Sequence, residues 1–307
     1  MKTSNVSVTF PLALVLASSP TWAEMSALGE TELSDVTGAN GITMEMSTLA
    51  SVGRIEFESS GSLQVDEVVA GGAGVTTSGA SKGFGQYFDQ LTLSLDILED
   101  GVMQIGLRPL PTGTTGAPDT IDWGVSTGAI DLIAESGETA RIASGLEAWG
   151  RILSADYKIG PSLDVAGYDS QRALMIFTIE DLDLLADVQG LAVQDLKVLG
   201  TESTDNGGTA MGTDALTAFF TNETNLSADE ISRSVSGAEQ GFAVLNSSVG
   251  VEPVEVDGVT RELRTIRIDA MAADISVKSM AVGGTDLGAT HLDNLRVSDT
   301  TIRFNNY

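Results

Sequence analysis

The stretch LTLSLDIL, residues 91–98, alternates apolar and polar residues along most of its length. Successive side chains of a β-strand point to opposite faces of a sheet, so this period of two is typical of a strand with one buried face. The same texture recurs in ITMEM (42–46), RIEFE (54–58), SLQVDEVV (62–69), VMQIGL (102–107), ALMIFTIEDLDLL (173–185), LAVQDLKVL (191–199), TRELRTIRIDAM (260–271) and DISVKSMAV (274–282). Turn-forming Gly, Asn and Asp residues separate these stretches, so the sequence predicts a mainly β fold. We expect an elongated antiparallel β-sheet, or a sandwich or solenoid-like stack.

One region breaks this texture and predicts a short helical insertion. It runs from about residue 213 to 245 and contains TDALTAFF and LSADEISRSVSGAEQGFAVL. Ser227 followed by Glu230 resembles a capping box, in which each side chain bonds the backbone of the other at the start of a helix.

A short pattern occurs four times, with an apolar residue, two polar residues, Leu, a polar residue and then Leu or Val. It begins at Phe88 (FDQLTL), Ile179 (IEDLDL), Val193 (VQDLKV) and Leu292 (LDNLRV). The step from a spacing of three to a spacing of two indicates a turn or a β-bulge that leads into a strand. Chance recurrence in an acidic, strand-rich sequence is the alternative.

The first 23 residues, MKTSNVSVTFPLALVLASSPTWA, have the three parts of a secretory signal peptide: a basic residue, an apolar stretch and small residues before the cleavage site. We expect cleavage between Ala23 and Glu24; a buried N-terminal strand is the alternative. Residues 24–40 then predict a short segment, helical if Gly38 acts as its C-cap. Residues 41–307 are expected to form a single large β-rich domain.

Composition narrows the classes of function. The formal net charge is -27, from 16 Lys+Arg and 43 Asp+Glu, and this repels nucleic acid. The chain has no cysteine, which excludes disulfides and thiolate chemistry. No stretch after the signal peptide has about 18 uninterrupted apolar residues, so we expect no membrane insertion.

Catalytic and metal-binding patterns are weak. The sequence GVSTG (124–128) matches the G-x-S-x-G pattern around a nucleophilic serine, here Ser126, and His291 lies downstream. The following AIDLIAE is equally typical of a strand, so we interpret the match as coincidence and His291 as an exposed strand residue. Asp181 and Asp183 lie in an acidic run that raises Ca²⁺ binding as an alternative to a solvated acidic face. We expect no catalytic, cofactor-binding or metal-binding residues.

The two ends of the chain resemble a known group of proteins. The segments ALGETELSDVTGANGITMEM (27–46) and VGGTDLGATHLDNLRVSDTTIRF (282–304) resemble the ends of Fil-type proteins, exported components of pilus or filament systems in Gram-negative bacteria. Ala39 and Asn40 stand where the family usually has Gln and Ala. The segment around Leu33 and Gly38 also looks like a double-glycine leader, which would place a second cleavage after Ala39.

These observations predict an exported structural or adhesive surface protein without catalysis, associated with a pilus or filament. Its expected partners are further copies of itself or other surface proteins, with strand edges as the interface. Its expected location is the cell surface, the medium or the periplasm. A monomeric module that binds carbohydrate or Ca²⁺, and a secreted serine hydrolase, are the alternatives.

Overall fold

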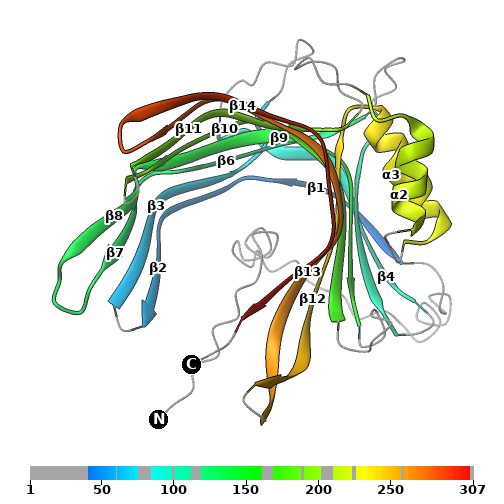
Figure 1. Cartoon of the computed structure of the whole chain (residues 1–307), viewed down its shortest axis with the longest axis horizontal. Helices are drawn as coiled ribbons and strands as arrows, with labels where there is room; N and C mark the ends of the chain where they lie inside the picture. The colour runs from blue at the N-terminus through cyan, green and yellow to red at the C-terminus, as the bar shows by residue number, and fades with distance from the viewer. Residues whose placement is uncertain are drawn as a thin grey trace, which may run out of the picture.

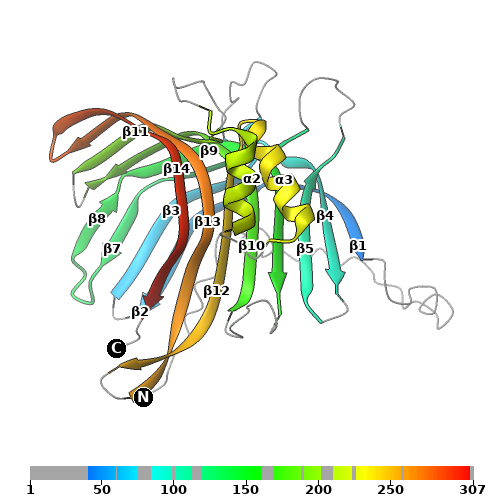
Figure 2. The same ribbon diagram turned by 45° about the vertical axis from the view of Figure 1, so that its right-hand side comes forward.

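The computed structural model describes residues 41–59, 61–74, 84–98, 101–111, 119–160, 169–187, 190–201, 210–222, 226–256 and 259–304. Within these ranges the chain forms one strongly arched sheet with two helices against its outer, convex side (Figures 1 and 2). The predicted processing residues Ala23 and Glu24, and the predicted segment 24–40, lie outside the described residues.

The strands are β1 (Ile42–Thr48), β2 (Ala50–Ser59), β3 (Gly61–Gly71), β4 (Phe88–Ile97), β5 (Met103–Pro109), β6 (Ile121–Thr127), β7 (Ile130–Ile133), β8 (Thr139–Ala143), β9 (Gly145–Ile159), β10 (Asp169–Ala186), β11 (Leu191–Leu199), β12 (Ala243–Val256), β13 (Val259–Val282) and β14 (Thr285–Phe304). The helices are α2 (Thr213–Asn222) and α3 (Ala228–Glu239). The prediction of a mainly β fold with a short helical insertion is confirmed. Of the three sheet arrangements expected, the open antiparallel sheet is the one that forms.

The sheet has two arms because its long central strands change neighbours part of the way along. β9 pairs with β6 through residues 146–152 and with β5 through residues 155–159. β13 pairs with β12 in its first half and with β11 in its second half. The strand order is therefore β14-β13-β12-β10-β9-β5-β4-β1 across one arm and β14-β13-β11-β10-β9-β6-β3-β2 across the other, with β7 and β8 continuing beside β3. Every pairing between the described strands is antiparallel.

Apolar residues are buried on both faces of the sheet. On the outer face, α2 and α3 cover the middle of β10, β12 and β13, and the largest fully buried side chain there is Phe220. On the inner, concave face, Leu91 of β4 and Ile121 of β6 are fully buried together, although β4 and β6 are not neighbours in the sheet. The arch thus brings separate parts of one face into contact.

The four-fold sequence pattern corresponds to irregularities in the strands, as the bulge interpretation predicts. In three of its four occurrences the third residue has a positive φ: Gln90 (58°), Asp195 (50°) and Asn294 (54°). In the fourth, the pairing of β10 with β9 shifts register between Ile179 and Asp181. Glu67 and Asp299 also have a φ of 50°, at positions that the four-fold pattern does not include.

These irregularities explain why the first apolar residue of the four-fold pattern and its Leu are three residues apart. A bulge adds one residue to a strand, so apolar residues three apart still reach the same face. Leu295 pairs with Ala273 and Leu292 with Ile275, both on the inner face. Bulges also bend the strand that carries them, and their repetition in neighbouring strands accounts for the arch in Figure 1.

The helical insertion is shorter than predicted. The capping box at Ser227 and Glu230 is present, as expected. The predicted extension to residue 245 is wrong, because Gly241 has a φ of 84° and ends the helix. The Phe242 N–H bonds the Gly237 carbonyl and the Gly241 N–H bonds the Ala238 carbonyl, the pattern of a Schellman C-cap. The apolar residues 243–245 then belong to β12.

Candidate functional site

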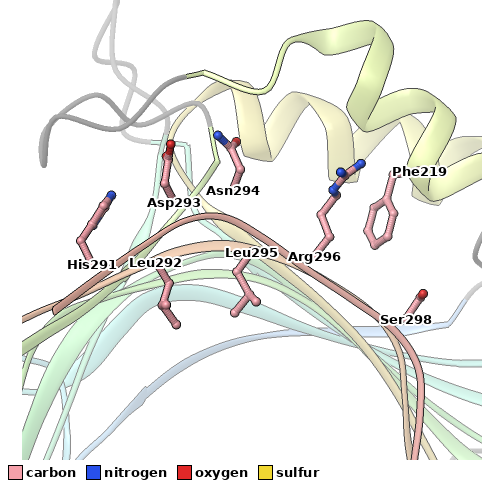
Figure 3. A pocket seen from close by; sticks show the side chains of 8 residues that line it. All are labelled: Phe219, His291, Leu292, Asp293, Asn294, Leu295, Arg296 and Ser298. Carbon is pink, nitrogen blue, oxygen red and sulfur yellow. The ribbon is translucent and has the colours of Figure 1, made fainter.

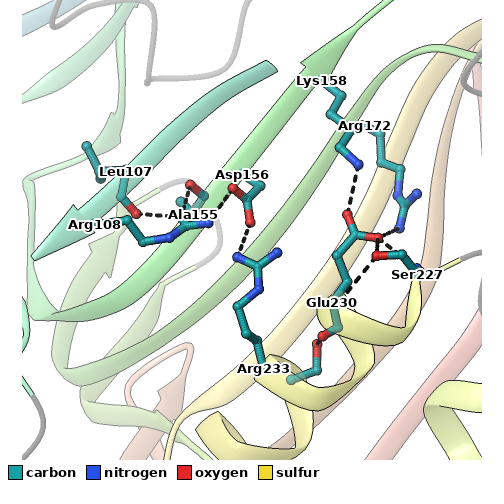
Figure 4. A network of polar contacts seen from close by, with 10 residues as sticks. Leu107, Arg108, Ala155, Asp156, Lys158, Arg172, Ser227, Glu230 and Arg233 are labelled. Carbon is teal, nitrogen blue, oxygen red and sulfur yellow. Dashed lines mark hydrogen bonds and ion pairs between the residues drawn. The ribbon is translucent and has the colours of Figure 1, made fainter. Parts of the chain in front are cut away.

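A polar network joins α3 to the outer face of the sheet (Figure 4). Asp156 of β9 is buried and accepts hydrogen bonds from Arg108 of β5 at 2.6 Å and from Arg233 of α3 at 2.7 Å. One carboxylate therefore holds three elements together. Asp156 was not among the predicted site residues, because no local pattern marks a strand aspartate as buried.

Glu230 is the second buried carboxylate of the network. Its Oε1 lies 3.0 Å from Lys158 Nζ, and its Oε2 lies 3.6 Å from Arg172. Burial alone would raise the pKa of Glu230, but the hydrogen bond from the Ser227 N–H, the charge of Arg172 and the hydrogen bond from Lys158 lower the pKa to about 2. Such a strongly ionised group is a poor proton acceptor at neutral pH. We interpret the network as the attachment of α3 to the sheet.

A shallow hollow of about 640 Å³ lies between α2 and the outer face of β14. Figure 3 shows His291, Asp293 and Arg296 on its lining, while Leu292 and Leu295 point to the inner face. His291 is exposed in β14, as predicted. The hollow is open and its polar lining is exposed, so it offers a contact surface and not an enclosed reaction site.

The serine-nucleophile hypothesis is wrong. Ser126 lies within β6, paired with Val69 on one side and Glu147 on the other, and the next element is strand β7. A nucleophile elbow needs a sharp turn from a strand into a helix. Ser126 and His291 are also five strand spacings apart in the sheet, roughly 24 Å at the usual interstrand distance.

The acidic run of β10 takes part in strand pairing. Asp183 Oδ1 accepts a hydrogen bond at 2.8 Å from the N–H of Asp195, a bulge residue with positive φ. In β13, Asp274 accepts the N–H of the bulge residue Asn294 in the same way, at 2.7 Å. Burial raises the pKa of Asp181, and the nearby charges of Asp183 and Asp195 raise it further. Aspartates thus satisfy backbone groups that bulges remove from the hydrogen-bond ladder.

The described part of the chain contains no group of three or more His, Asp or Glu side chains that could hold a metal ion. None of the helices described is long and apolar enough to cross a membrane.

The sheet ends in two long edges, one formed by β14 and the other by β1 and β2. β14 pairs with β13 alone among the described strands, and its 20 residues run over both arms (Figure 2). At the opposite side, β1 pairs with β4 and β2 with β3, and only Leu49 separates β1 from β2. Neither edge contains Lys or Pro, the residues that commonly block pairing at a sheet edge.

The edges also carry exposed apolar side chains. Examples are Ile42 at 60% exposure and Phe57 at 57% on β1 and β2, and Leu287 at 55% and Phe304 at 49% on β14. Unpaired backbone groups beside apolar side chains make such an edge competent to accept another strand. These two edges are therefore the candidate functional site, and tertiary structure was needed to find them.

Comparison with known proteins gives limited information about function. No curated protein and no solved structure matches the chain. A family model described as a family of unknown function, DUF6160, matches residues 1–99, which include the predicted signal peptide and strands β1 to β4.

Proposed function

We propose that this chain is an exported structural protein of the cell surface of a Gram-negative bacterium. It is a component of, or accessory to, a pilus or adhesive filament, and it works by assembly through its edge strands and not by catalysis. The observation that carries the proposal is the pair of long edges, each with a row of apolar side chains on its inner face and neither with Lys or Pro. The likeness of the two chain ends to Fil-type proteins supports the connection with filaments.

The negative net charge of the protein opposes this assembly. Copies with a net charge of -27 repel one another at long range, and salt screens this repulsion over about 10 Å at 0.1 M. Pairing through backbone hydrogen bonds and apolar contacts is short-ranged and survives screening. Assembly is therefore expected to increase with ionic strength.

Light scattering and electron microscopy on the chain beginning at Glu24 test the proposal. The mean mass is expected to rise with protein concentration, and to rise further between low salt and about 0.3 M NaCl because repulsion is screened. Immunogold labelling of intact producing cells tests surface exposure. A strict monomer at high concentration and high salt, with no surface protein recovered by crosslinking, would overturn the proposal.

A lysine variant on each edge provides the specific control. Met44→Lys and Ile302→Lys place a charge on an exposed apolar position of β1 and β14, and Ser232→Lys places the same charge on the exposed side of α3. The edge variants are expected to weaken assembly roughly tenfold or more, because a charge must be buried or the edge must splay. The α3 variant is expected to assemble like the parent chain.

A further inference from the structure

We propose that the assembly is head-to-tail: β14 of one copy pairs antiparallel with the edge formed by β1 and β2 of the next copy. This inference rests on the proposed function, and it names the partner of each edge as the opposite edge of a second copy. Three properties of the described strands support it: their directions, their lengths and the side chains on their inner face.

The strand directions allow a continuous antiparallel sheet. Each pairing reverses direction, so β14 runs parallel to β9, whereas β1 and β2 run parallel to β10. The two edges of the sheet therefore run in opposite directions. A second copy placed beside the first by simple translation across the strands meets it with an antiparallel pair, and the sheet continues without a change of pattern.

The two edges also match in length and profile. β14 has 20 residues, while β1 and β2 have 7 and 10 residues on either side of Leu49. Both edges run over both arms of the arch, so translation sets each arm beside the same arm of the next copy. In the alternative, a two-fold axis would pair the edge of β1 and β2 with the same edge of a second copy. The 7-residue β1 of one copy would then lie against the 10-residue β2 of the other.

Both edges show an apolar row on the inner face of the sheet. On β14 this row includes Leu292, Leu295, Val297, Ile302 and Phe304, which pair with Ile275, Ala273, Met271, Ile266 and Arg264 of β13. On the opposite edge it includes Ile42, Met44, Met46, Val52, Ile55 and Phe57, which pair with Leu95, Leu93, Leu91, Val68, Val65 and Leu63.

Head-to-tail pairing places these two rows side by side. Cross-strand apolar neighbours stabilise a sheet, and the exposed parts of both rows are covered by the contact. The product is an extended trough whose apolar inner face continues from copy to copy. Because the contact uses two different edges, it does not close on itself and produces a filament.

Introduced cysteines test this pairing cleanly because the chain has none of its own. Following the strand pairings across the sheet from β1 to β14, Ile42 is level with Thr300 and Met44 with Val297, so translation across the strands sets Met44 of one copy beside Val297 of the next. We therefore choose Met44→Cys, Val297→Cys and the double variant, with Ser232→Cys on α3 as the control. A bismaleimide crosslinker tolerates an offset of one residue pair along the strands, about 7 Å.

Head-to-tail pairing predicts a specific set of products. The two single variants are expected to crosslink as dimers only when mixed, and the double variant is expected to give a ladder of dimers, trimers and longer species. The Ser232→Cys variant is expected to give none of these products.

The failures are distinguishable. Crosslinking of either edge variant with itself shows a two-fold contact and overturns the head-to-tail inference. So does an absence of crosslinks while light scattering of the same samples shows assembly. If light scattering shows only monomer, the proposed function itself fails. The lysine variants give a second readout: a mixture of Met44→Lys and Ile302→Lys keeps one free edge of each kind and is expected to stop at dimers.

Discussion

Replacing Glu230 by Gln removes the charge at the centre of the contact between α3 and the sheet. The Glu230 side chain is 6% exposed, and its carboxylate oxygens lie 3.0 Å from Lys158 and 3.6 Å from Arg172. Gln keeps the size of the side chain and can still bond the Ser227 backbone, so the change isolates the charge. The expected result is a less stable protein at neutral pH.

The pKa of Glu230 sets the size of this effect. The fall of this pKa from its ordinary value of 4.5 to about 2 corresponds to about 3 kcal/mol of stabilisation by the ionised form, at about 1.4 kcal/mol for each pKa unit. Because the pKa is lower in the folded protein than in the unfolded chain, this stabilisation is fully present above about pH 4.5. It is lost as the pH falls toward 2 and the carboxylate becomes protonated.

Urea unfolding followed by the fluorescence of Trp123 and Trp149 measures the free energy of unfolding at each pH. At pH 7, Glu230→Gln is expected to lose about 3 kcal/mol relative to the parent chain, and the difference is expected to shrink steadily between pH 5 and pH 2. Asp229→Asn, an exposed neighbour in the same helical turn, is the control for loss of one negative charge. A loss below 1 kcal/mol at pH 7, or a loss that stays constant down to pH 2, would refute the role assigned to this network.

Three further changes test the core and the bulges. Phe220→Ala, at a fully buried position between α2 and the sheet, is expected to cost about 3–5 kcal/mol in urea unfolding, whereas Tyr87→Ala at an exposed position should change stability by under about 0.5 kcal/mol. Asp274→Ala removes the acceptor of the Asn294 N–H and is expected to cost about 1–3 kcal/mol; unchanged amide exchange at Asn294 would contradict this contact. Glu67→Gly relieves a φ of 50° and is expected to gain about 1 kcal/mol, whereas Glu58→Gly in an ordinary strand position is expected to lose a similar amount.

Much of the local structure could be predicted because it depends on neighbours in the sequence. Alternation in residues 91–98 and 191–199 identified β4 and β11. The capping box of Ser227 and Glu230 was recognisable because both residues bond the same turn of backbone. The spacing of three before Leu91 and Leu196 indicated irregular strands, and positive φ values are found at Gln90 and Asp195.

Other elements could not be predicted, because their conformation depends on competing local preferences or on partners far away in the sequence. Residues 243–245 continue an apolar pattern that suits either a helix or a strand, and the turn at Gly241 together with pairing to β10 selects the strand. β9 mixes apolar and charged residues, and its Asp156 and Lys158 are acceptable inside the protein only because Arg233 and Glu230 of α3 meet them. Those partners lie more than seventy residues away in the chain.

The sequence by itself determined the strand texture, the irregular positions within the four-fold pattern and the helix start, since each depends on backbone preferences and side-chain spacing over a few residues. Tertiary structure alone decided which strands lie at the edges of the sheet. An edge strand and a central strand have similar periodicity, and the difference between them is whether a second neighbour supplies hydrogen-bond partners. For β14 and for β1 with β2, no described strand of the same chain supplies that neighbour, and this is the physical basis for assigning their partner to a second copy.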